Sequence, residues 1–379
     1  MRGMDHHLDL VISKKDLLRL VDRCHSVADK KSALPSLSNI LLTAYGDTLH
    51  AAATDLYLAV ETQANAEVSG KGSVAVPAKD MRERVAAMPD GHVHLTADAA
   101  AKLTIKAVGA QRRYTLHGIP GSEFPQLPEP EAGAHAMEIG ANILRDLLEA
   151  THFSISPDET RPHVNSALFE WAGDRVRMVS TDGHRLSKME ATVSGSRATA
   201  TMLIPLKAIG ELRRLVSDAK AETVKIVQSG PNAFFSVAGV QFSVKLVDAT
   251  FPPYQQVIPA KLDQTVKAPR VVLASALKAV SLAASDRTGG VKITLTKDML
   301  KIMSESPESG QGYDEVAVEY GGQDVVVGFN AKYLLDALGA IDADEVLLGL
   351  SGELDPGLIR PADESKDRSY LAVCMPLRL

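Results

Sequence analysis

The sequence predicts an α+β fold of three similar domains, each combining two helices with antiparallel sheets. The first observation is an internal repeat, because residues 76–85 are matched by residues 204–213 and, in outline, by residues 328–337. The second is that helix-like apolar spacing alternates with strand-like runs in every copy. The third is the period of the repeat, which far exceeds the roughly 20–45 residues of solenoid repeats, so each copy is large enough for its own core.

The first helix of each copy is predicted from its apolar spacing. After Ser13, the chain begins like a capping box, because Asp16 follows three residues later. Leu17, Val21 and Cys24 are then spaced by four and three residues, which predicts one buried stripe. The corresponding helices of the next two copies are predicted over residues 141–151 and 274–284.

The second helix of the first two copies follows a proline. Pro77 and Pro205 are predicted to lie in the first helical turn, where proline is tolerated. Strands are predicted between the helices, among them residues 167–171, 234–237 and 291–295.

Pro- and Ala-rich connectors end the first two copies. They follow the similar segments Phe124–Pro128 and Phe251–Tyr254. The predicted domains are therefore residues 1–133, 134–260 and 261–379.

Composition limits the possible classes of protein. Apolar residues make up 45 % of the chain, which is typical of a globular protein, and the net charge of −6 argues against a surface that grips nucleic acid everywhere. No apolar run approaches the roughly 20 residues of a membrane span, and the start MRGMDHHLDL has no secretion signal, although whether it is native stays open. We therefore expect a cytoplasmic protein with two reduced thiols, Cys24 and Cys374.

Two further stretches indicate where a functional site lies. Thr181–Leu186 reads TDGHRL between two strand-like runs, and its Asp-Gly pair predicts a hairpin corner. The chain ends on Tyr370–Leu379, which remains apolar to the last residue, whereas most chain ends are polar. Such an end is expected to be docked in a groove or to line one.

The TDGHRL run, the MPLRL end and the segment Phe251–Pro259 together resemble the bacterial DNA polymerase III beta subunit family, the sliding clamps. The resemblance covers essentially the whole chain, in order. It implies a DNA-clamp fold, a ring-forming homodimer and a non-catalytic processivity factor in DNA replication that needs no cofactor. The implied partners are duplex DNA bound without sequence preference, the polymerase III catalytic subunit, a clamp loader and other proteins with clamp-binding motifs, all in the cytoplasm at the nucleoid and none in a membrane.

The resemblance also implies a peptide-binding pocket between the second and third domains. Its residues would be Val164, Thr181, Gly183, His184, Arg185, Leu186, Pro252, Val257, Gly357, Val373, Met375, Pro376, Leu377 and Arg378. The aliphatic and Met side chains would supply an adaptable apolar surface. Arg185 and Arg378 are expected to act as polar anchors at the rim.

Basic residues recur on equivalent predicted helices, which indicates a shared lining that faces DNA. The expected DNA-facing residues are Lys15, Arg19, Arg23, Lys31, Lys79, Arg82, Arg145, Lys207, Arg213, Lys278 and Lys332, together with Arg161, whose loop the resemblance matches to one that touches DNA. A solvated helix face is the plain alternative for any single helix. The resemblance further places Tyr114 and Leu116 on an edge strand that would face Leu282 and Ala283 of a partner chain.

Two other functions are alternatives to the clamp. A repeat scaffold that binds peptides but not DNA is the alternative, and a mixed-sign inner face would favour it. Asp182 and His184 with Ser180 or Ser187 suggest a hydrolase, but the G-x-S-x-G setting of a nucleophile elbow is missing. The sequence also contains no CxxC, HExxH, GxGxxG or GxxxxGK[ST] motif, so catalysis is not expected.

Overall fold

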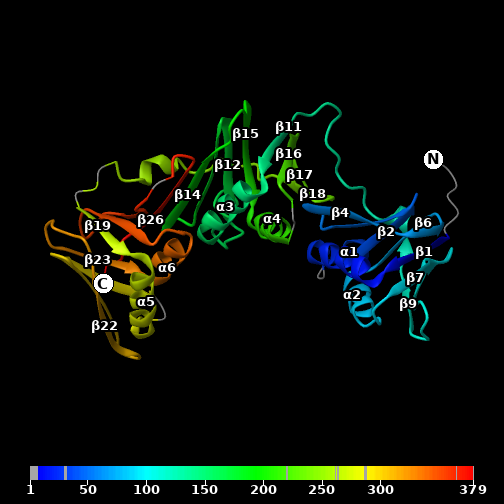
Figure 1. Ribbon diagram of the computed structural model, residues 1–379, viewed down its shortest axis with the longest axis horizontal. Coiled ribbons are helices and arrows are strands. Elements are labelled where there is room, and N and C mark those ends of the chain that lie inside the picture. The colour runs from blue at the N-terminus through cyan, green and yellow to red at the C-terminus, as the bar shows by residue number, and fades with distance from the viewer. Residues whose placement is uncertain are drawn as a thin grey trace. The chain divides into compact units, whose positions relative to one another are not determined.

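The computed structural model describes residues 7–29, 32–218, 221–260, 262, 264–285, 288–363 and 365–378. The chain forms two compact units (Figure 1). Unit 1 contains residues 1–141 and 214–246, and unit 2 contains residues 142–213 and 247–379.

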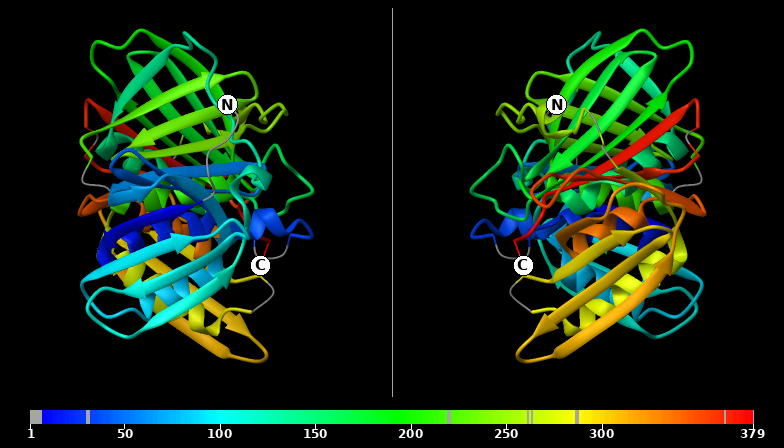
Figure 2. Two further views of the ribbon diagram at one scale, coloured as in Figure 1. Left: turned by 90° about the vertical axis from the view of Figure 1, so that its right-hand side faces the viewer. Right: turned by 90° about the vertical axis from the view of Figure 1, so that its left-hand side faces the viewer.

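Unit 1 contains two antiparallel sheets. The five-stranded sheet has the order β5-β1-β7-β8-β9, and its strands lie side by side in the left view of Figure 2. Its strands are β5 (Glu67–Gly70), β1 (Leu8–Ser13), β7 (His92–Ala97), β8 (Lys102–Ala107) and β9 (Arg113–His117). The nine-stranded sheet has the order β10-β6-β2-β3-β4-β18-β17-β16-β11. Its strands are β10 (Ile119–Pro120), β6 (Gly72–Pro77), β2 (Asn39–Tyr45), β3 (Thr48–Thr54), β4 (Leu58–Asn65), β18 (Val240–Lys245), β17 (Asn232–Val237), β16 (Thr223–Ser229) and β11 (Ala136–Gly140).

Unit 2 also contains two antiparallel sheets. The eight-stranded sheet has the order β15-β12-β13-β14-β26-β25-β24-β19. Its strands are β15 (Ala198–Pro205), β12 (Ser166–Gly173), β13 (Arg175–Thr181), β14 (Arg185–Thr192), β26 (Arg368–Cys374), β25 (Gly357–Pro361), β24 (Glu345–Leu350) and β19 (Gln264–Pro269). The four-stranded sheet has the order β22-β21-β20-β23 and is visible in the right view of Figure 2. Its strands are β22 (Gly310–Ala317), β21 (Met299–Ser306), β20 (Gly290–Thr296) and β23 (Val325–Asn330).

Each α-helix that the structure describes directly follows a strand. The helices are α1 (Lys14–Val27), α2 (Ala78–Ala86), α3 (Ala141–Thr151), α4 (Leu206–Asp218), α5 (Arg270–Val280) and α6 (Ala331–Gly339). None of them has the length and apolar composition that a membrane crossing requires. The repeated strand-to-helix junction is the structural form of the sequence repeat.

Helix α1 forms as its sequence predicts. Ser13 is the N-cap, and its hydroxyl accepts a hydrogen bond from the Asp16 backbone N–H at 3.1 Å. Leu17, Val21 and Cys24 are fully buried, so the predicted stripe is confirmed. This apolar face packs against β3, β4 and α2.

Two helix starts differ from the prediction. Pro77 and Pro205 do not lie in a first helical turn, because each is the last residue of its strand and the helix begins one residue later. Helix α5 begins at Arg270, four residues before the predicted start, directly after Pro269. In each case the fixed φ of proline suits the last extended residue, and proline needs no N–H there.

The predicted strands and thiols are confirmed. Residues 167–171, 234–237 and 291–295 lie within β12, β17 and β20. Cys24 and Cys374 are buried and free. Burial raises the pKa of each thiol to about 12, because a charged thiolate is unfavourable without water.

Candidate functional site

The TDGHRL segment forms a tight corner between β13 and β14, as predicted. Thr181 Oγ1 donates to the Arg185 carbonyl oxygen at 2.6 Å, and the Gly183 N–H donates to Thr181 Oγ1 at 3.1 Å. The backbone N–H groups of His184 and Arg185 donate to Asp182 Oδ1 at 2.9 and 3.0 Å. Gly183 has φ +94°, which glycine adopts without a Cβ penalty. Asp182 therefore fixes the backbone of the corner.

The Arg185 guanidinium is engaged inside the unit. Its Nε lies 3.0 Å from Asp182, its Nη1 lies 2.6 Å from Asp336 on α6, and its Nη2 donates to the Phe153 carbonyl oxygen. It also stacks on the Tyr333 ring at 4.5 Å. Burial alone would lower the pKa of Arg185, but its carboxylate partners raise the pKa above its ordinary value. The residue links the corner to α6, and its role as a rim anchor remains a prediction.

The apolar chain end was expected either to be docked or to line a groove, and the structure shows it docked against the rest of unit 2. Strand β26 lies between β14 and β25, with Leu186 opposite Val373. Beyond β26, the Met375 N–H donates to the His184 carbonyl oxygen at 2.9 Å and the Leu377 N–H donates to the Gly328 carbonyl oxygen at 2.8 Å. The first bond places Met375 directly beside the TDGHRL corner, and the second joins Leu377 to β23.

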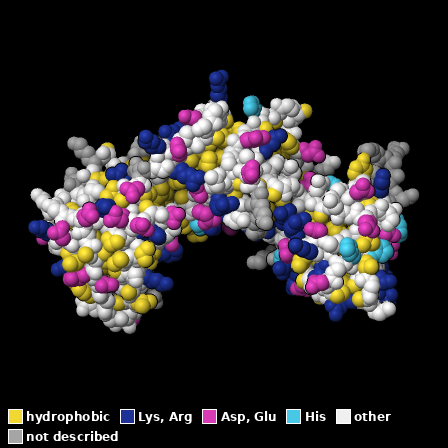
Figure 3. Space-filling model, viewed as in Figure 1, with side chains coloured by type: hydrophobic (Ala, Val, Ile, Leu, Met, Phe, Trp, Pro, Cys, Tyr) yellow, Lys and Arg dark blue, Asp and Glu magenta, His cyan; other side chains and the backbone are white. Residues whose placement is uncertain are grey.

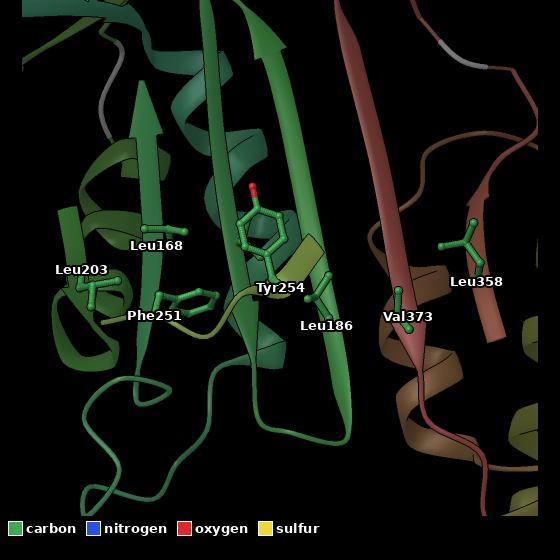
Figure 4. Packing of buried hydrophobic residues seen from close by; sticks show 8 residues of the cluster. Leu168, Leu186, Leu203, Phe251, Tyr254, Leu358 and Val373 are labelled. Atoms are coloured by element: carbon green, nitrogen blue, oxygen red, sulfur yellow. The ribbon is translucent and has the colours of Figure 1, made fainter. Parts of the chain in front are cut away.

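A connected apolar cluster spans the strands next to this corner (Figure 4). Phe251 and Tyr254 come from the segment that crosses over the strands, and the other members come from β12, β13, β14, β15, β25 and β26. Its buried members are Leu168, Val179, Leu186, Leu203, Phe251, Tyr254, Leu358 and Val373. Val257 and Ile258 are only partly buried against it, so apolar surface remains accessible at its border.

The structure brings many of the predicted pocket residues to this region. Leu186 and Val373 belong to the cluster, Val257 packs on it, and Pro252 is the neighbour of Phe251. Gly357 pairs with Cys374, and its Cα faces the Phe329 ring so closely that a Cβ would lie 2.6 Å from Cζ. The other predicted positions are Val164, which is buried in the loop before β12; Thr181, Met375, Pro376 and Leu377, which are half-buried; and Gly183, His184 and Arg378, which are exposed.

Sequence reasoning missed several cluster residues. Leu168, Val179, Leu203 and Leu358 were not assigned to the site, although they lie on strands with runs of three or four consecutive buried residues. Such apolar runs predict strands that are covered on both faces, but they do not show which other segment covers each face. In the segment that crosses over the strands, the two aromatic residues Phe251 and Tyr254 were the sequence feature that could have indicated this contact.

Polar groups border the cluster. Arg177 Nη1 donates to the Tyr254 hydroxyl at 3.3 Å, and this hydroxyl donates to Glu170 at 3.2 Å. Burial is the main cause that raises the pKa of Tyr254. The ring of Tyr254 is thus held over the strands by its polar end.

The predicted DNA-facing residues lie on all six described helices and in one loop. Lys15, Arg19 and Arg23 are on α1; Lys79 and Arg82 on α2; Arg145 on α3; Lys207 and Arg213 on α4; Lys278 on α5; Lys332 on α6; and Arg161 in the loop between α3 and β12. Lys31 lies outside the described residues.

Many of these cations have carboxylate partners within their own unit. Arg82 lies 2.6 Å from Asp22, Arg213 lies 2.6 Å from Glu149, and Lys332 lies 2.7 Å from Asp336. Pairs between residues three or four positions apart in the sequence also join Arg19 to Asp16, Lys79 to Glu83 and Arg161 to Asp158. The face in Figure 3 likewise shows cations and carboxylates interleaved on both units. Exposed pairs of this kind contribute only about 0–1 kcal/mol each, so phosphates can compete for the cations.

The predicted interface residues lie at or near sheet edges. Tyr114 and Leu116 are on β9, which is an edge of the five-stranded sheet. Leu282 and Ala283 are in a 3₁₀ turn that contacts β22, an edge of the four-stranded sheet. Leu282 is 82 % exposed, whereas Leu116 and Ala283 are buried.

Comparisons with known proteins agree with this architecture. Three models of the DNA polymerase III beta subunit match in chain order: the N-terminal domain over residues 8–128, the central domain over 138–253 and the C-terminal domain over 255–378. The beta sliding clamp of Pseudomonas aeruginosa is 31 % identical over 375 residues, covering 98 % of this chain and all of that protein. The beta sliding clamp of Caulobacter vibrioides is 30 % identical with the same coverage.

Solved structures give the same result. A sliding clamp from Bartonella birtlesii, bound to griselimycin, superposes with a TM-score of 0.92 at 32 % identity, covering 99 % of this chain and all of that one. The Caulobacter crescentus beta sliding clamp, with polyethylene glycol in a putative beta-motif tethering region, has a TM-score of 0.91 at 30 % identity, covering 98 % of this chain and all of that one. The chain has the three-domain clamp fold and belongs to the DNA polymerase III beta subunit family.

Proposed function

We propose that two copies of this chain form a ring around duplex DNA and hold the replicative polymerase on it. The family consists of non-catalytic processivity factors of DNA polymerase III. The chain would therefore act by topological linkage and peptide binding, without a cofactor, at the nucleoid in the cytoplasm. Its partners would be the polymerase III catalytic subunit, a clamp loader and other proteins with clamp-binding motifs.

One observation supports the tethering role most directly. The corner Thr181–Arg185, the terminal strand β26 and the segment around Phe251 meet at one apolar cluster. Its border includes Val257 and Ile258, which are only partly buried. An apolar patch beside a rigid corner suits a short linear motif, because apolar pockets and a few fixed polar groups are what such motifs use.

The recurrence of cations on the helices supports contact with DNA that has no sequence preference, whereas their pairing with carboxylates, taken alone, is the mixed-sign pattern expected of the peptide scaffold. Cations are present on all six described helices, yet many are paired with nearby carboxylates. Phosphate contacts position a protein without reading bases, and contacts that must first displace a carboxylate are weak. Weak contacts allow the ring to move along the duplex.

The edge strands support a head-to-tail dimer. We propose that β9 of one chain pairs with β22 of its partner, since this contact would cover two sheet edges and close a ring by a heterologous interface. Leu282 would supply the exposed apolar side chain. Leu116 and Ala283 are buried, so their strand and turn would contribute mainly through the backbone.

We further propose the domain boundaries 1–133, 134–260 and 261–379. The sheets are continuous across these boundaries, since β4 pairs with β18 and β14 pairs with β26. Each boundary would therefore be a change of structural repeat and not a break in a sheet.

The experiment that tests the function is primer extension on a long, singly primed circular template with the cognate polymerase and loader. The expected result is a large increase in product length per binding event when the chain is added. Unchanged product length, with binding of the polymerase retained, would instead favour the scaffold that binds peptides but not DNA.

A further inference from the structure

The nine-stranded sheet of unit 1 has a groove on the face opposite α1. Arg23 of α1 donates to Thr62 Oγ1 at 3.2 Å, so Thr62 faces the helix and its neighbour Glu61 faces the other side. There the connector after β10 passes over the strands and borders two cavities of about 680 and 350 Å³. Residues that line them include Leu41, Ala52, Ala59, Leu127, Phe234 and Ser243.

The strands below this groove repeat the strand pairing below the apolar cluster of unit 2. Six of the eight buried cluster positions have a counterpart that lines the groove, at the same place in the ladder or in the crossing segment. The matched pairs are Leu41 and Leu168, Ala52 and Val179, Ala59 and Leu186, Leu127 and Tyr254, Ser243 and Val373, and Phe234 and Leu358. The groove is therefore the first-repeat copy of the region proposed to bind partner peptides.

The corner beside it is copied bond for bond. Thr54 Oγ1 donates to the Leu58 carbonyl oxygen at 2.7 Å, and the Leu56 N–H donates to Thr54 Oγ1 at 2.9 Å. The N–H groups of Tyr57 and Leu58 donate to Asp55 Oδ1, and the Lys245 N–H donates to the Tyr57 carbonyl oxygen at 2.8 Å. The equivalent atoms of Thr181–Arg185 and Met375 in unit 2 make the same hydrogen bonds.

One residue of this corner is unusual. Leu56 has φ +74°, a conformation that is unfavourable for a bulky side chain, and its side chain is 57 % exposed. Tyr57 beside it is 65 % exposed. Strain together with exposed apolar side chains is more common at binding sites than elsewhere on a surface.

Smaller side chains keep the groove open. Four of the six matched positions have a smaller residue in unit 1: Val, Leu, Val and Tyr in unit 2 are replaced by Ala52, Ala59, Ser243 and Leu127. In unit 2 the larger side chains fill the space and are buried. Replacing large by small residues leaves a cavity when the neighbours do not collapse. The cavity volumes fall in the range of ligand sites.

The charge at the groove differs from that of its counterpart, where Lys188 and Arg177 are paired with Glu190 and Glu170. Glu61 occupies the position that Lys188 occupies in unit 2, and His50 occupies the position of Arg177. Glu61 and Glu129 line both cavities, and His50 lies 3.8 Å from Glu61. Lys225 is the cation that lines the smaller cavity. The shared centre of the groove is therefore acidic.

We propose that this groove is a second docking site, and that it binds a short extended peptide with a Lys or Arg next to an apolar residue. The cation would lie between Glu61 and Glu129, and the apolar side chain would enter the space over Ala52 and Ala59. Because Glu61 of unit 1 occupies the position of Lys188 in unit 2, the two sites would select different peptides, and a ligand of one would not displace a ligand of the other.

The test uses the full chain and two fluorescein-labelled hexapeptides, GRLGLG and its acidic counterpart GELGLG, with binding followed by fluorescence anisotropy. The basic peptide is expected to bind at least tenfold more tightly than the acidic one. Glu61→Lys should weaken the basic peptide about tenfold or more and reduce the preference. Ala59→Leu, which introduces the side chain of the matching residue Leu186, should also weaken binding of the basic peptide.

The control is Glu67→Lys, the same charge change on exposed β5 of the same unit. It should leave both affinities unchanged. The proposal is overturned if GRLGLG does not bind at about 1 mM, or if Glu61→Lys binds it as the wild type does. Binding of the cognate polymerase to Glu61→Lys should remain normal, so a failure of this site is distinguishable from a failure of the unit 2 site.

Discussion

At the residue scale, two glycines of the candidate site are required for different reasons. Gly183 has φ +94° with open space around it, since the nearest atom to an added Cβ is Arg161 Nη1 at 4.0 Å. Gly357 has ordinary φ, but an added Cβ would lie 2.6 Å from Phe329 Cζ. The first position is limited by backbone conformation and the second by packing.

Gly183→Ala should lower the free energy of unfolding by about 1–2 kcal/mol, the cost of a left-handed L-residue. Gly357→Ala should cost about 1–3 kcal/mol through overpacking. Chemical denaturation measures both, and Phe329→Leu should recover part of the loss only at Gly357. Equal recovery at both positions would contradict this distinction.

The thiols provide a second residue-scale prediction. Burial raises the pKa of Cys24 and Cys374 to about 12, so a thiol reagent at pH 8 should label neither until the chain unfolds. The folded state holds these protons more tightly than the unfolded state, so stability should decrease as pH rises from about 9 towards about 12. Rapid labelling of both thiols in the native protein would show that the cores are open.

The sequence predicted local features of the fold and of the site well. The hairpin at Asp182-Gly183 and the Ser13 cap depend on neighbouring residues, and both are confirmed. The pairing of Arg185 with Asp336 was not predicted, because the partners are 151 positions apart and no local pattern relates them. The early start of α5 was missed because Pro269 was not recognised as a strand end.

At the element scale, the terminal segment is expected to be needed for polymerase binding but not for formation of the dimer. Residues 375–378 follow β26; the Met375 bond joins them to the corner and the Leu377 bond joins them to β23, whereas the pairing of β26 with β14 ends at Cys374. The segment can therefore be removed without removing a strand from the sheet.

Deleting Met375–Leu379 should abolish binding of the cognate polymerase while the dimer remains intact. Surface plasmon resonance measures the first property and analytical ultracentrifugation the second. Loss of both would refute a pocket that is separate from the dimer interface. Retained polymerase binding would remove the terminal segment from the site.

The element scale also shows what sequence patterns left open. Repeated helices and strands were visible from periodicity and turn residues. The insertion of β26 between β14 and β25 was not, because strand order depends on contacts between distant segments. The likeness of the two corners, Thr54–Leu58 and Thr181–Arg185, became evident only from their hydrogen bonds.

At the scale of the whole molecule, the net charge is −6 although cations recur on the helices. We therefore expect DNA to contact the helices and not the rest of the surface. Replacing Arg19, Arg23 and Arg82 by Glu should reduce loading onto DNA severalfold at low salt, and the defect should become smaller as salt rises, because the variant makes fewer phosphate contacts and releases fewer counterions. The matched control replaces Lys71, Lys102 and Lys106 by Glu. These residues are exposed on the same unit but are not on its helices. Equal defects in both variants would mean that total charge, not its position, controls loading.

The central claim is topological linkage, and retention on DNA tests it most directly. The chain is loaded onto nicked circular DNA by the cognate loader, the loader is removed, and half of the sample is cut once with a restriction enzyme. The account predicts that the chain stays on the circles and is lost from the linear molecules. Equal loss from both forms, or equal retention on both, would contradict a closed ring.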